Sequence, residues 1–106
     1  MAFVTTPRSG QAKILTFRVT DQPATTCTSG VWKKLLLVDG KIGSDAEPAY
    51  SVEGRALSIS INANICDAND DINGELAAAT FKGDRRAGGM FGSTLIGSVR
   101  GSCVQQ

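Results

Sequence analysis

The residues best suited to chemistry lie in one short acidic stretch, residues 65–75, whose sequence is ICDANDDINGE. Its carboxylates, which directly follow a cysteine, are Asp67, Asp70, Asp71 and Glu75. Clustered carboxylate and amide oxygens can bind Ca²⁺. Two carboxylates in a cleft can hydrolyse a glycoside if one keeps its proton while the other stays ionised. The stretch therefore raises three hypotheses, which are a metal site, a catalytic pair and a polar loop.

The calcium motif is incomplete. Asn69, Asp71, Asn73 and Gly74 fit the first positions of an EF-hand frame, but Thr80 stands where a bidentate Glu is required. A frame that starts at Asp67 places Ile72 where Gly is needed. Only a looser calcium site from Asp67, Asp70 and Asp71 remains as a candidate. We therefore predict a solvated turn, in which Asn and Asp bond their own backbone, and no metal or cofactor.

Several other chemistries are excluded by residue type. The chain has no histidine, which removes Ser-His-Asp and Cys-His catalysis and zinc sites that use imidazole. Three cysteines cannot form a four-cysteine zinc site, and none are spaced as CxxC. The glycine patterns of dinucleotide and P-loop sites are absent. A carboxylate-based hydrolase is the one enzymatic alternative left, and we expect no enzymatic activity.

The net charge and the hydropathy pattern of the chain limit the classes of partner that we expect. The net charge is +1, whereas nucleic-acid binding of a domain this size depends on a clear basic excess. No apolar run approaches the roughly 20 residues of a membrane-spanning helix. No signal peptide is visible in the first residues. We therefore expect a protein partner, no nucleic acid and no transmembrane segment.

The three cysteines, Cys27, Cys66 and Cys103, lie beside polar or small residues near predicted strand ends. That placement favours a disulfide, and hence a periplasmic or secreted protein, although reduced cytoplasmic cysteines remain an alternative. If each turn reverses the chain, Cys66 and Cys103 fall at one end of the sheet and Cys27 at the other. This count predicts a Cys66–Cys103 disulfide with Cys27 free. If 50–65 is one bulged strand, Cys27–Cys103 is open as well.

The elements that would position these residues are β-strands. In LSISINANI, residues 57–65, apolar and polar residues alternate strictly, which indicates a strand with one buried face. Tyr50 and Val52 have the opposite phase, so a type II′ hairpin at Gly54-Arg55 or a bulge must intervene. Further strands are expected at 13–19, 31–38 and 89–99. Residues 74–83, GELAAATFKG, fit either a strand or a short helix.

These elements predict a single all-β domain over residues 1–106. We expect a small antiparallel β-barrel or sandwich of five to seven short strands, with the one short helix near 70–80 as an alternative. Residues 1–11 are expected to be a loosely ordered N-terminal arm.

The leading functional hypothesis is a non-enzymatic interaction domain that presents loops on a rigid β scaffold to a protein partner, as an inhibitor or surface factor does. Candidate contact residues are Trp32, Tyr50, Arg85 and Arg86. Aromatic residues at strand spacing more often belong to a core. The second hypothesis is a barrel that binds an apolar small molecule in its interior, and the third is the hydrolase.

Overall fold

The computed structural model describes residues 2–7, 13–27, 30–89 and 92–102, and its regular elements are all strands. In chain order they are β1 (Ala2–Pro7), β2 (Lys13–Pro23), β3 (Lys33–Asp39), β4 (Ala49–Glu53), β5 (Ala56–Ser60), β6 (Ala68–Ala77), β7 (Thr80–Gly89) and β8 (Gly92–Ser102). The predicted all-β class is confirmed. The alternative of a short helix near 70–80 is wrong, because β6, a turn and β7 occupy that region.

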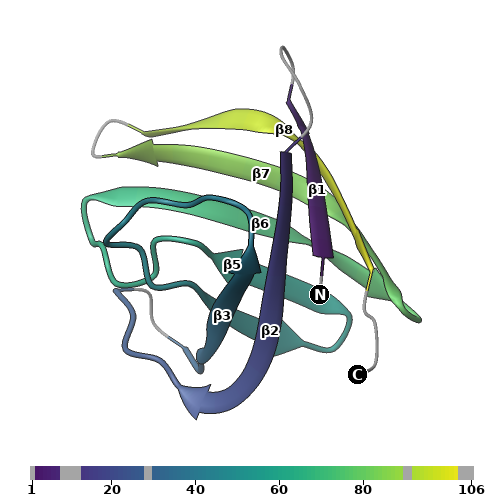
Figure 1. The fold of residues 1–106 in the computed structure, drawn as a ribbon, viewed down its shortest axis with the longest axis horizontal. Coiled ribbons are helices and arrows are strands. Elements are labelled where there is room, and N and C mark those ends of the chain that lie inside the picture. Colours follow the sequence, from purple (N-terminus) through teal and green to yellow (C-terminus); the bar gives the residue numbers. More distant parts are fainter. Residues whose placement is uncertain (1, 8–12, 28–29, 90–91, 103–106) are drawn as a thin grey trace.

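The strands form an antiparallel barrel. Each strand pairs with the next one along the chain, and β8 returns to β1, which closes the strand order (Figure 1). The ladders differ in length. β6 and β7 are paired along their whole length, whereas β3 and β4 are joined only at Lys33↔Tyr50 and Lys34↔Ala49. We call this short ladder the β3–β4 seam.

The barrel interior is filled by the side chains that the alternating pattern predicted. Leu57, Ile59, Ile61 and Ala63 are all buried. The strand itself ends at Ser60, since residues 61–64 form turns, so the predicted strand over 57–65 is too long. The same core contains Leu15, Phe17, Leu35, Ile72, Phe81 and Val99, which come from β2, β3, β6, β7 and β8.

Two tight hairpins set the register of the central strands. Gly54 and Arg55 form a two-residue turn between β4 and β5, and of these two only Gly54 has a positive φ, +63°. That pattern matches the predicted type II′ hairpin and removes the alternative of one bulged strand. Ala78 and Ala79 form the corresponding turn between β6 and β7.

The acidic stretch is a strand rather than a loop for most of its length. Ala68–Ala77 forms β6, which pairs with β5 on one side and β7 on the other. Asn, Asp and Gly are poor strand formers, but two flanking ladders satisfy the backbone and override that preference. The prediction of a solvated turn is therefore wrong from residue 68 onward.

The N-terminal segment also departs from expectation. Ala2–Pro7 forms β1, which pairs with both β2 and β8 and so completes the barrel. The predicted loose arm over 1–11 is wrong for these residues, because barrel closure needs a strand between β8 and β2. The rest of that segment, residues 1 and 8–11, lies outside the described residues.

Candidate functional site

The carboxylates of the acidic stretch do not converge. Successive strand residues point to opposite faces, so Asp70 and Asp71 lie on different sides of β6. Asp70 shares its face with the buried Ile72 and accepts two hydrogen bonds from Arg85, from Nε at 2.8 Å and from Nη2 at 2.6 Å. Asp71 accepts one from the amide of Asn69 at 3.1 Å.

The calcium candidate is therefore not assembled. Within the described ranges no group of three or more acidic, cysteine or histidine residues could hold a metal ion. Asp70 already has a cationic partner, and the two side chains are only 17 % and 14 % exposed. Asp67 and Glu75 are exposed. Neither the calcium site nor a carboxylate pair in a cleft has support from this arrangement.

The four candidate contact residues fall into two groups. Trp32 and Tyr50 line one shallow hollow of about 570 Å³ at the β3–β4 seam. Arg85 instead belongs to the ion pair with Asp70, and Arg86 is exposed on β7. The hollow thus includes the two aromatic residues and neither arginine. Tyr50 on β4 and Arg85 on β7 lie in one cross-strand row, with Ile59 and Ile72 between them.

Tyr50 is held in place within its hollow. Its hydroxyl donates a hydrogen bond to the Thr20 carbonyl oxygen at 2.7 Å, which connects β4 to β2 across the end of β3. Burial raises the pKa of Tyr50, nearby Lys33 opposes that rise, and Asp21 adds to it. The phenol is therefore a neutral structural donor near neutral pH.

A disulfide joins two loops beside the seam. Cys27 and Cys66 are bonded, with their Cα atoms 5.4 Å apart, and the Cys27 N–H also donates to the Ala63 carbonyl at 3.1 Å. Cys66 therefore cannot pair with Cys103, so the predicted Cys66–Cys103 disulfide with Cys27 free is wrong. Cys103 itself lies outside the described part of the chain.

The reversal count failed because it ignored register. It placed Cys27 and Cys66 at opposite ends of the sheet. That placement is correct only if each strand begins beside the end of the strand before it. β4 begins beside Lys34, near the start of β3, because residues 40–48 carry the chain back along that strand. This slip in register brings the described part of 24–32 and residues 61–67 to the same corner of the barrel.

A third loop is tied to the same corner by Asn64. Its side-chain oxygen accepts a hydrogen bond from the Glu47 N–H at 2.8 Å, and its amide donates to the Asp45 carbonyl at 2.8 Å. We call the described parts of 24–32, 40–48 and 61–67 the loop cluster. Its members lie together at the left of Figure 1. One disulfide and one asparagine thus fix three loops relative to one another.

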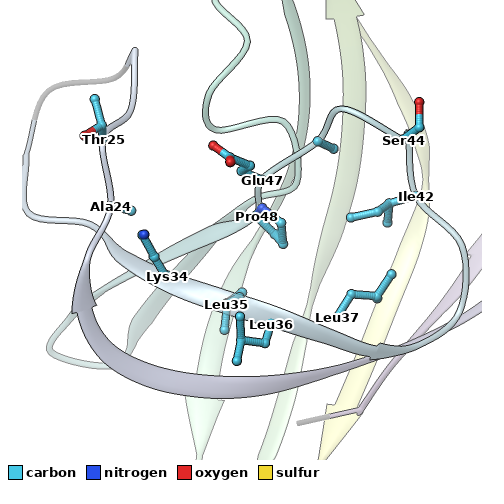
Figure 2. A pocket seen from close by; sticks show the side chains of 12 residues that line it. Ala24, Thr25, Lys34, Leu35, Leu36, Leu37, Ile42, Ser44, Glu47 and Pro48 are labelled. Carbon is cyan, nitrogen blue, oxygen red and sulfur yellow. The ribbon is translucent and has the colours of Figure 1, made fainter.

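An apolar groove lies within the loop cluster. It has a volume of about 620 Å³ and is bordered by β3 and by the arc of residues 42–48 (Figure 2). Leu35, Leu36, Leu37, Ile42 and Pro48 supply most of its apolar border, with Lys34, Ser44 and Glu47 at the rim.

The sequence interpretation missed this groove, although a signal was present. Residues 40–48 are too long for a tight hairpin and contain a proline, which cannot donate to a β-ladder. A wide, irregular connection beside an incompletely paired strand follows from those two features.

One apolar side chain of the groove, Leu36, is largely exposed to solvent. Leu36 is 49 % exposed on the outer face of β3, whereas the exposed Val31 belongs to the hollow of Trp32 and Tyr50. The barrel interior, by contrast, is occupied by buried core side chains from most of the strands. Both hollows described above lie beside β3 rather than among these core side chains.

No protein-family model, curated protein or solved structure matches this chain. The Cys27–Cys66 disulfide is consistent with an oxidising, extracytoplasmic location. Among the described residues no helix is long and apolar enough to cross a membrane.

Proposed function

We propose that this protein is a non-enzymatic binding domain, periplasmic or secreted, that engages a protein partner through the loop cluster. The observation that carries the proposal is the fixing of three loops around one apolar groove by the Cys27–Cys66 disulfide and by Asn64. Loops held in one geometry lose little conformational entropy on binding, which favours affinity. Loops on a rigid scaffold are a common location for binding residues.

The surroundings of the groove support a protein partner. Leu36 and Ile42 offer apolar contact, while Lys34 and Glu47 supply charges at the rim. An apolar centre with a polar rim is the usual composition of a protein interface. The carboxylates of β6 lie outside the groove, and Asp70 is neutralised by Arg85, so the hydrolase alternative gains no support.

Affinity capture with matched variants tests this proposal. The bait is the disulfide-intact protein, offered to an extracytoplasmic extract of the organism that encodes it. Leu36→Asp places a charge at the groove, whereas Ile14→Asp places the same charge at a similarly exposed aliphatic residue outside it, with exposures of 49 % and 58 %. We expect a partner retained by the parent protein and by Ile14→Asp but lost with Leu36→Asp. Equal retention by all three proteins would show that the groove is not the binding surface.

A further inference from the structure

The edge of β3 that faces the groove is incompletely paired. The Leu35 N–H donates to the Pro48 carbonyl at 3.0 Å, which is the next pairing along β3 after the two pairs of the seam. Proline has no N–H, so Pro48 cannot return a hydrogen bond to the Leu35 carbonyl. The ladder on this side therefore breaks at Pro48, while β3 continues to Asp39.

Strand alternation identifies the other groups on this edge. In an antiparallel ladder the N–H and C=O of one residue point to the same side, and the next residue points to the other side. Since the Leu35 N–H points toward the groove, so do the N–H and C=O of Leu37. Within the described residues no backbone partner is found for Leu37 on that side. The groove thus holds a donor and two acceptors in a row, the Leu35 C=O and both polar groups of Leu37.

These groups lie among apolar side chains. Leu35, Leu37, Ile42 and Pro48 border the same space (Figure 2), and Leu37 and Ile42 also pack against the core. A backbone N–H or C=O in such surroundings destabilises the protein unless water or a ligand forms a hydrogen bond with it. A ligand that satisfies them must offer hydrogen-bonding groups at strand spacing together with apolar side chains.

We propose that the groove binds a short extended segment of the partner polypeptide, which adds a strand to the open edge of β3. This inference rests on the proposed function and specifies its binding mode. Strand addition uses main-chain hydrogen bonds for affinity and alternate side chains for specificity. The segment pairs with Leu37 and directs an apolar side chain toward Ile42 and Pro48. Its length is limited to about four residues at roughly 3.3 Å each, because the chain returns to β3 at Pro48.

Amide hydrogen exchange measured by NMR tests the open edge without a partner. Leu36 pairs with Arg18 on β2, so its N–H is protected, whereas the neighbouring Leu37 N–H faces the groove. We expect Leu37 to exchange at least about tenfold faster than Leu36, since a ladder hydrogen bond limits exchange to local opening. Leu37 protected as strongly as Leu36 in the free protein would overturn the proposal.

A model peptide then tests strand addition. The probe is acetyl-Thr-Val-Thr-Val-amide at millimolar concentration, because alternating Val and Thr favour an extended strand with one apolar face. Its binding is expected to slow Leu37 exchange and to shift the NMR signals of Leu36 to Val38 and Ile42. The same peptide with N-methylated valines cannot donate from that edge and should bind about tenfold more weakly, as expected for the loss of one or two hydrogen bonds.

The outcomes separate this inference from the proposed function. No shifts at β3, shifts confined to other strands, or equal binding of the N-methylated peptide would each overturn strand addition. Affinity capture that still depends on Leu36 would in that case leave the loop cluster as the binding surface. Loss of that dependence, with strand addition of the probe intact, would instead overturn the partner proposal and leave only the strand-accepting edge of β3.

Discussion

The Cys27–Cys66 disulfide should be the largest single contributor to the stability of the loop cluster. The two cysteines are 39 residues apart, and the chain between them contains β3, β4 and β5. For a closed loop of that length the chain-entropy relation gives about 4 kcal/mol at 25 °C, as an upper value. A domain of this size has a total stability of only about 5–15 kcal/mol. Loss of the bond should therefore remove a large fraction of the unfolding free energy.

The assay is denaturant unfolding of three samples, the native protein, the native protein reduced with a phosphine, and the Cys27→Ser/Cys66→Ser double variant. We expect the last two to agree and to lie up to about 4 kcal/mol below the first. Peptide mapping without reduction identifies the bond independently. A Cys66–Cys103 peptide, or an unfolding free energy that the double substitution leaves unchanged, would refute the assignment.

Three further predictions concern single side chains. Asp70→Ala should lower the unfolding free energy by about 2–4 kcal/mol in urea, because it leaves the largely buried Arg85 without its counter-ion, and a change below about 0.5 kcal/mol would contradict that role. Ala78 has a φ of 55°, so Ala78→Gly should raise stability by about 0.5–1 kcal/mol in thermal unfolding, and a lower melting temperature would be the opposite result. The pKa of Tyr50 is raised from 10.0, so its stabilising effect is complete below pH 10 and declines as the pH rises through the folded-state pKa. That decline should be missing from Tyr50→Phe, and identical alkaline profiles for the two proteins would contradict it.

The alternation of apolar and polar residues within short segments was the most informative pattern in the sequence. Leu57, Ile59 and Ile61 point inward as their spacing predicted, and Gly54 provides the expected hairpin. These features depend on neighbouring residues only, so one sequence suffices to infer them. Even in β5 the polar face is not uniformly exposed to solvent, since Ser60 at the strand end is only 8 % exposed.

The features that sequence reasoning missed depend on residues far apart in the chain. β6 was mistaken for a loop because its polarity is balanced by partners on β5 and β7 and by Arg85, 15 residues after Asp70. The disulfide was assigned wrongly because the slip at the β3–β4 seam has no local signature. The length of the 40–48 connection and Pro48 were local clues to the groove, but their meaning depends on the strand beside them.

Site-specific photo-crosslinking tests the central claim, binding through the loop cluster, most directly. Benzoylphenylalanine replaces either Leu36, at the groove, or Lys82, which is exposed on β7 and borders neither hollow. Illumination in an extracytoplasmic extract should give a discrete crosslinked protein from position 36 and none from position 82. Crosslinking from position 82 alone, or the same products from both positions, would contradict the claim.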